Sequence, residues 1–164
     1  MIKITPPTPE TPPTETIVAR IRANAVSHPD HLALVCGEDH LTWGAFDLRI
    51  NRVANLLIEM ELGKDDNVAI ISANSIAYAE LFMGILRAGA CVTPLSSMAS
   101  SDALKKMLTD CQAKVIFVAE QYLDLVEGFL PDLPVKCFAI NFKDPRFDDY
   151  EMAIVKPAPM NVLS

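Results

Sequence analysis

Residues 68–95, VAIISANSIAYAELFMGILRAGACVTPL, decide the fold of this chain. They begin with a short apolar run over residues 68–71, which is typical of a strand covered on both faces. Asn74 or Ser75 can cap the helix that we expect over residues 76–88. Residues 91–93 form a second predicted strand, and the following proline ends it because proline cannot donate to an inner ladder. Two strands joined by about 20 residues predict a parallel βαβ unit.

Upstream of this unit, the sequence predicts a lead, a helix, a hairpin and a second helix. Residues 1–14 hold five prolines among threonines, which is typical of an extended or disordered lead. We expect the first helix over residues 15–27, and a β-hairpin where two strand-like runs flank Gly37. Thr42 can cap the second helix, whose apolar face repeats at spacings of three and four. Asp47 and Arg49 are expected on the solvent side of that helix.

Downstream, helical and strand patterns continue to alternate. The polar loop over residues 96–101 can cap a helix that faces inward through Leu104 and Cys111. Strands are predicted over residues 115–118 and 135–140, with a helix over residues 122–130 between them. This order predicts an α/β fold: a three-layer, mostly parallel sheet with helices on both faces, plus the small N-terminal hairpin. The α/β unit spans residues 15–143, and residues 144–164 are expected to be an irregular acidic and proline-containing tail.

Length and charge limit the class of protein. The chain has 164 residues, enough for one domain with a substantial core. Its formal net charge is −7 and its longest basic run is Lys105-Lys106, so nucleic acid is not expected as a partner. Glu80 and Arg87 interrupt the most apolar helix and argue against a membrane span. The apolar fraction of 51% indicates either a well-filled domain or a face intended for a neighbour.

The potential metal ligands form no recognisable metal site. The four cysteines include no CxxC pair, and we expect them to be buried, reduced and typical of a cytoplasmic protein. His28 and His31 flank a proline break, with no acidic or thiol ligand in register. Asp148, Asp149 and Glu151 lack the calcium-loop pattern and are interpreted as a solvated turn. No bound metal is therefore predicted.

Ligands of open α/β sheets bind outside the carboxyl ends of the strands, which here are followed by residues 72–75, 94–101 and 119–121. A phosphate cradle needs glycine there, because backbone N–H groups must converge on the anion. None of the six glycines lies in these loops. No serine has the G-x-S-x-G setting of a nucleophile, and Tyr78 and Met98 are at most pocket-lining residues. The residues alone thus indicate an α/β domain without a catalytic set.

Three segments in this order nevertheless resemble a known family. They are LTWG at residues 41–44 leading into NRVANLL at 51–57, NVAIISANS at 67–75, and MGILRAGACVTPL at 83–95. Together they resemble the start of the AMP-forming adenylating enzymes, which include acyl-CoA synthetases, firefly luciferase and peptide-synthetase adenylation domains. The third segment is close to the "gilkaGavyvPl" signature of that family. The resemblance runs from about residue 15 to residue 140.

The resemblance implies the N-terminal portion of an acyl-CoA synthetase, in which a carboxylic acid and ATP give acyl-AMP and CoA then accepts the acyl group. The full enzyme would need ATP, Mg²⁺ and CoA. The phosphate loop, its lysine and the C-terminal domain are expected beyond residue 164, so the chain alone should bind no cofactor and hold no catalytic residue. Ser96 and Ser97 replace the usual Asn-Pro, and with Met98 they are the candidates to approach the acyl or pantetheine tunnel.

Other hypotheses stay open beside this one. The chain could be a free-standing interaction or regulatory domain that reuses the fold, or a flavodoxin-like cofactor binder. The resemblance also leaves open which acid is used and whether CoA or a carrier protein accepts it. If the chain is part of a larger enzyme, the remainder of that enzyme is its main partner. Apolar surface normally covered by that remainder predicts a homodimer of the separate chain.

Overall fold

The computed structural model describes residues 16–155. The predicted lead over residues 1–14 and the end of the predicted tail lie outside the described residues.

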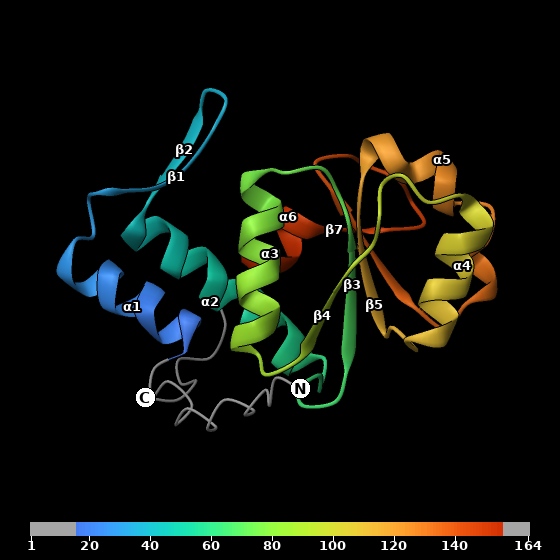
Figure 1. The fold of residues 1–164 in the computed structure, drawn as a ribbon, viewed down its shortest axis with the longest axis horizontal. Helices are drawn as coiled ribbons and strands as arrows, with labels where there is room; N and C mark the ends of the chain where they lie inside the picture. The colour runs from blue at the N-terminus through green and yellow to red at the C-terminus, as the bar shows by residue number, and fades with distance from the viewer. Residues whose placement is uncertain (1–15, 156–164) are drawn as a thin grey trace, which may run out of the picture.

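The described chain alternates helices and strands in the order that the sequence predicts (Figure 1). The helices are α1 (Ile17–Ser27), α2 (Trp43–Glu59), α3 (Ile76–Arg87), α4 (Ser101–Asp110), α5 (Leu123–Val126) and α6 (Tyr150–Val155), with short 3₁₀ turns η1 (Glu120–Tyr122) and η2 (Leu130–Asp132). The strands are β1 (Leu32–Cys36), β2 (Asp39–Thr42), β3 (Asn67–Ile71), β4 (Cys91–Pro94), β5 (Val115–Ala119), β6 (Lys136–Ile140) and β7 (Asp148–Asp149).

Four helices begin at the capping residues that their sequences offer. The side-chain oxygens of Thr16, Thr42, Ser75 and Ser100 accept hydrogen bonds from the N–H groups three residues further on, at 3.0–3.3 Å. Each bond satisfies one of the free donors of the first helical turn, which fixes where the helix starts. Ser75, rather than Asn74, is thus the cap of α3.

The main sheet has five strands in the order β4-β3-β5-β6-β7, and every neighbouring pair is parallel. The pairing of β3 with β4 across α3 confirms the predicted βαβ unit. β3 and β5 are almost wholly buried because helices cover both faces of the sheet. A second, two-stranded sheet is the antiparallel β1–β2 hairpin, in which Gly37 takes a left-handed φ of +64°.

Two layers of helices cover the sheet, one on each face (Figure 1). On one face, α2, α3 and α6 pack through a core that includes Leu57, Leu81 and Tyr150 against alternate residues of β3, β5 and β6. On the other face, α4 and α5 cover the remaining strand residues through Leu104 and Val126. The α/β fold class predicted from the sequence, with its small hairpin, is confirmed.

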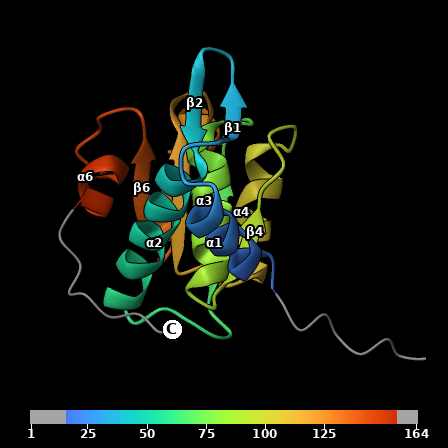
Figure 2. The same cartoon turned by 90° about the vertical axis from the view of Figure 1, so that its left-hand side faces the viewer.

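A third, smaller cluster joins the N-terminal elements to α3. Ile21 of α1 packs with Phe46 and Ile50 of α2, and Leu34 and Leu41 of the hairpin lie against them. Figure 2 shows α1 and α2 side by side, with the hairpin extending beyond the ends of the helices. The hairpin therefore reaches away from the main sheet.

Two predicted segments differ from the structure. Residues 148–155, expected to be part of an irregular tail, form β7 and α6, and the side chains of Tyr150 and Ile154 are buried. The helix expected over residues 122–130 is reduced to the single turn of α5 between two 3₁₀ turns. Gly128 and Pro131 lie just beyond that turn, and both residue types oppose helix continuation.

Candidate functional site

The carboxyl edge of the sheet contains the point at which strand order reverses. From β3 the chain crosses to β4 at the sheet edge, and from β4 it returns past β3 to β5. The loops that leave β3 and β5 therefore separate at this point, which is where open α/β sheets bind ligands. A hollow of about 180 Å³ lies there, lined by residues 72–75, residues 119–121, Ile140 and Asn141.

The structure brings two of the three predicted edge loops into this hollow. The two serine hydroxyls of these loops already have local partners: Ser75 Oγ caps α3, and Ser72 Oγ donates to the carbonyl oxygen of Ala73 at 2.9 Å. Asn141 has a left-handed φ of +62° and follows β6. No glycine lies among the lining residues, so the backbone cannot form the converging N–H groups of a phosphate cradle.

The third predicted loop lies outside this hollow. Ser96, Ser97 and Met98 are all exposed in the turn between β4 and α4, and the side chain of Met98 is 95% exposed. The Met98 N–H donates a local hydrogen bond to Ser96 Oγ at 3.3 Å within this turn. Their approach to an acyl or pantetheine tunnel stays a prediction.

A second hollow, of about 290 Å³, adjoins the first through Asn141. It is lined by charged side chains of four elements: Asp39 of β2, Arg49 of α2, Glu80 of α3 and Glu151 of α6. Arg49 Nε donates to Glu80 Oε1 at 2.5 Å, and Arg49 Nη2 donates to Glu151 Oε1 at 2.6 Å. The two carboxylates thus share one guanidinium.

Glu80 is the fully buried member of this charged cluster. Its second carboxylate oxygen accepts a 2.9 Å hydrogen bond from the Tyr150 hydroxyl. Burial raises the pKa of the Glu80 carboxyl above its usual range, and the Arg49 guanidinium opposes that rise. Burial and the neighbouring Glu80 carboxyl raise the pKa of the Tyr150 hydroxyl well above its usual value, so the phenol stays a donor. The cluster joins α2, α3 and α6.

A second charged cluster lies where α1, α2 and α3 meet. Arg87 donates to the carbonyl oxygen of Val18 at 3.0 Å and to the side-chain oxygen of Asn51 at 2.8 Å, and it pairs with Asp47 at 2.8 Å. Asp47 and Arg49 were expected on the solvent side of α2, and that prediction is wrong for Asp47, which is 9% exposed. Its charge is tolerated because Arg87 of the neighbouring helix pairs with it.

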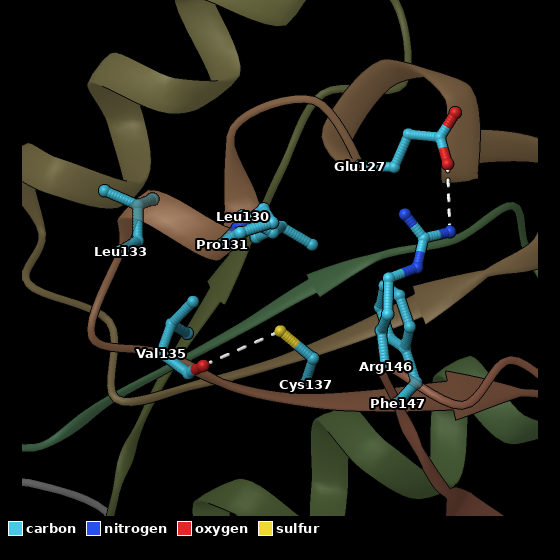
Figure 3. Close-up of a pocket in the computed structure, with 8 residues that line it drawn as sticks. All are labelled: Glu127, Leu130, Pro131, Leu133, Val135, Cys137, Arg146 and Phe147. Carbon is cyan, nitrogen blue, oxygen red and sulfur yellow. Dashed lines mark hydrogen bonds and ion pairs between the residues drawn. The ribbon is translucent and has the colours of Figure 1, made fainter.

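An apolar hollow near the far edge of the sheet has a volume of about 300 Å³ (Figure 3). Leu130, Leu133 and Phe147 line it, and the ion pair between Arg146 and Glu127, 2.9 Å long, lies at its rim. Cys137 is its one thiol, and Cys137 Sγ lies 3.6 Å from the carbonyl oxygen of Val135. Burial raises the pKa of this thiol, which disfavours the nucleophilic thiolate.

The cysteines and the acidic turn offer no metal centre. All four cysteines are free, but none is buried: Cys36 and Cys91 are exposed, and Cys111 and Cys137 are half-buried, so the expectation of buried thiols is wrong. Among residues 16–155, no group of three or more histidine, cysteine, aspartate or glutamate side chains is placed to hold a metal ion. Within the same range no helix is long and apolar enough to cross a bilayer.

The sequence reasoning identified the edge loops but missed the two charged clusters. Charged residues inside an apolar helical pattern were the available signal, since Glu80 and Arg87 both interrupt the surface of α3. The partners of Glu80 are Arg49 and Tyr150, which lie 31 and 70 residues away in the sequence. No local pattern encodes such distant pairs.

Comparison with known proteins finds CoA ligases and a gramicidin synthase among the similar proteins. The chain is 32% identical over 122 residues to a medium/long-chain-fatty-acid–CoA/3-oxocholest-4-en-26-oate–CoA ligase of Mycobacterium marinum, covering 74% of this chain and 22% of that protein. It is 28% identical to gramicidin S synthase 1 of Brevibacillus brevis, covering 73% of this chain and 11% of that protein. A crystal structure described as a long-chain-fatty-acid CoA ligase from Rhodopseudomonas palustris superposes with a TM-score of 0.79 at 28% identity, covering 84% of this chain and 36% of the other.

These matches show which family the chain belongs to and how much of a relative's length it covers. The chain spans about a fifth of the length of the curated ligase that it matches. The sequence profile of the AMP-binding enzymes matches residues 21–158, which is most of the chain. The chain therefore belongs to the AMP-binding enzyme family and corresponds to an N-terminal part of an AMP-forming acyl-CoA synthetase.

Proposed function

We propose that this chain serves as the N-terminal scaffold of an AMP-dependent acyl-CoA synthetase and is catalytically silent by itself. The complete enzyme would convert a carboxylic acid and ATP into acyl-AMP and pyrophosphate, and then transfer the acyl group to CoA. The relative from M. marinum is named as a fatty-acid and steroid-acid CoA ligase, which supports an aliphatic acid as the substrate class.

One observation carries the silent part of the proposal: the carboxyl-edge hollow is built without the groups that adenylation needs. The phosphates of a nucleoside triphosphate require converging N–H donors and cations, and Mg²⁺ requires carboxylate oxygens. The hollow is lined by residues 72–75 and 119–121 without a glycine, lysine or arginine, and one glutamate is its only acid. The residues that line this hollow therefore do not supply the groups that ATP or Mg²⁺ would need, which supports the proposal.

The first experiment measures pyrophosphate release by the purified chain with ATP, Mg²⁺ and a panel of fatty and aromatic acids. We expect no release above a protein-free blank. Acid-dependent release by the 164 residues would overturn the silent part of the proposal.

The second experiment tests the scaffold role directly. Residues 21–158, the range of the family match, replace the corresponding segment of the M. marinum ligase. We expect this chimera to form acyl-CoA, whereas the same ligase with the segment deleted should not. A chimera that folds but forms no acyl-adenylate would contradict the scaffold role and favour a free-standing interaction or regulatory domain.

Ser96, Ser97 and Met98 remain the proposed approach to the acyl or pantetheine tunnel. Their exposure on the turn after β4 leaves them free to contact a further domain. In the active chimera, Met98→Ala should change the KM for the acid or for CoA while the thermal midpoint stays constant. Unchanged KM values for both substrates would remove this role.

We further propose that the separate chain forms homodimers and that the parent enzyme is cytoplasmic. Large apolar side chains such as Val26 and Met152, 76% and 70% exposed, support association. The absence of a disulfide among the four cysteines supports a reducing compartment. Light scattering at high protein concentration tests the first point, and a monomer mass would refute it.

A further inference from the structure

The outer edge of β1 is a strand edge without a partner among the described residues. β1 pairs with β2 on one side only, and the resulting sheet has two strands. A two-stranded hairpin is marginally stable by itself, and larger sheets or packing on a helix are needed to hold it. One face of this hairpin is held in that way, since Leu34 and Leu41 pack on the cluster around Phe46.

The other face and the outer edge of β1 are open and apolar. Leu32 and Val35 are 60% and 65% exposed although both are large aliphatic residues. The strand Leu32–Cys36 contains no charge and no proline. Protected edge strands usually carry charges, proline or a strong bulge. β1 has neither charge nor proline, and its one pairing irregularity lies between Leu32 and Leu34, so the part of the edge near Val35 is chemically suited to accept another strand.

The edge of the main sheet at β4 is protected. Cys91 N–H donates to the carbonyl oxygen of Asp66, and Leu95 N–H donates to that of Ile70, both at 2.8 Å. Successive residues of a strand direct their backbone N–H and C=O groups to opposite sides, so those of Val92 and Pro94 point away from β3. Pro94 has no N–H, so this edge offers only half of the usual donors.

The two remaining edges are charged. β7 consists of Asp148–Asp149, and Asp148 is engaged by Lys136 in a 2.6 Å ion pair. The outer side of β2 carries Asp39 and His40, which line the charged hollow beside Arg49. Of the strand edges in the described chain, β1 is thus the one with neither charge nor proline.

We propose that β1 accepts an additional, uncharged β-strand and that this strand comes from the polypeptide that the matched relatives carry beyond the segment covered here. The inference rests on the proposed scaffold function, and it names the contact through which the scaffold recruits the rest of the enzyme. Backbone hydrogen bonds supply the contact, and Leu32 and Val35 supply the apolar surface.

The same polypeptide is favoured over a second copy of the chain for two reasons. The match covers 22% of the M. marinum ligase, so most of that enzyme is available as a tethered partner at high effective concentration. An antiparallel β1–β1 pair centred on Leu34 would place Asp30 of one copy near Glu38 of the other, and like charges in that position disfavour a second copy at this edge.

Val35 is the residue whose backbone reports on this contact. Cys36 and Asp39 flank the two-residue turn, so they form a ladder pair that exchanges hydrogen bonds. Val35, one residue earlier, therefore directs its N–H and C=O away from β2. The pairing irregularity between Leu32 and Leu34 confines regular docking to the part of β1 near Val35.

The test compares amide hydrogen exchange in the separate chain and in the ligase chimera described above. We expect exchange of the Val35 amide to slow by about tenfold or more in the chimera, as befits one new backbone hydrogen bond. The matched variants are Val35→Pro, which removes the N–H, and Val35→Thr, which keeps it. In the separate chain both variants should have the same thermal midpoint, whereas in the chimera only Val35→Pro should lower it.

The outcomes separate this inference from the scaffold function. An active chimera whose Val35 amide exchanges as fast as in the separate chain would overturn the strand contact and leave the scaffold role standing. An inactive chimera with a protected Val35 amide would support the contact and contradict the scaffold role. Protection in the separate chain, whether or not dilution removes it, would overturn the proposal, because a second copy or the chain itself would then cover the edge.

Discussion

Gly84→Ala tests the close packing of α3 on α2 at Val53. A Cβ at Gly84 would lie 2.4 Å from Val53 Cβ and 2.5 Å from Val53 Cγ1, well inside van der Waals contact. Neither atom is at the end of a flexible side chain, because valine branches at Cβ and is held in one rotamer on a helix. The helices must therefore separate for the methyl group to fit.

The magnitude follows from two opposed terms. Alanine is intrinsically better than glycine within a helix by about 1 kcal/mol. Overpacking of a filled core costs about 1–3 kcal/mol, and the short distances place Gly84→Ala at the upper end. We expect a net loss of about 2 kcal/mol in the free energy of unfolding, or a fall of about 4–8 °C in the thermal midpoint.

Urea unfolding followed by circular dichroism measures this difference. Gly128→Ala is the matched control, because a Cβ there meets nothing within 4 Å. The control should leave stability unchanged or raise it by up to about 1 kcal/mol. If Gly84→Ala were as stable as the unmodified chain, the close packing of α2 on α3 would be refuted.

Three further predictions concern side chains. Tyr150→Phe removes the donor to buried Glu80 and should lower the free energy of unfolding by about 1–3 kcal/mol in urea titration, and no loss would show that the hydrogen bond is absent. The Arg146 guanidinium lowers the pKa of the Asp144 carboxyl to about 2. The stabilisation by this ion pair should therefore be present above about pH 4 and disappear as the pH falls towards 2. NMR titration measures the pKa of Asp144, and a value near 4 would exclude the pair. Iodoacetamide should modify Cys137 more slowly than exposed Cys91 in mass spectrometry, since burial raises the pKa of the Cys137 thiol, and equal rates would contradict that shift.

Local patterns in the sequence are sufficient to predict the scaffold. The apolar runs that became β3, β5 and β6 are continuous because helices cover both faces of the sheet, and the caps of α2 and α3 are visible as Thr42 and Ser75. Hydrophobic periodicity reports burial directly, so these elements need no knowledge of distant residues.

The parts that local patterns could not predict depend on pairing across the chain. β7 lies within the acidic run and α6 begins at its end, and α6 is held by the burial of Tyr150 against strands and helices far away in the sequence. Asp47 was expected in solvent because a charge on a helix is normally solvated, yet Arg87 pairs with it from α3. At the carboxyl edge the loops could be located, but their shared hollow required the strand order.

The buried charges matter more for geometry than for stability. Removing an ion pair from water costs several kcal/mol per ion, and apolar replacements of similar volume are often as stable. The bonds from Arg49 to Glu80 and Glu151, and from Tyr150 to Glu80, instead link α6 to α2 and α3 through specific side-chain contacts. The same cluster lines the hollow next to Asn141 at the carboxyl edge. A chain whose proposed role is to hold further polypeptide in place needs this edge fixed, and the cluster fixes it without supplying a reactive group.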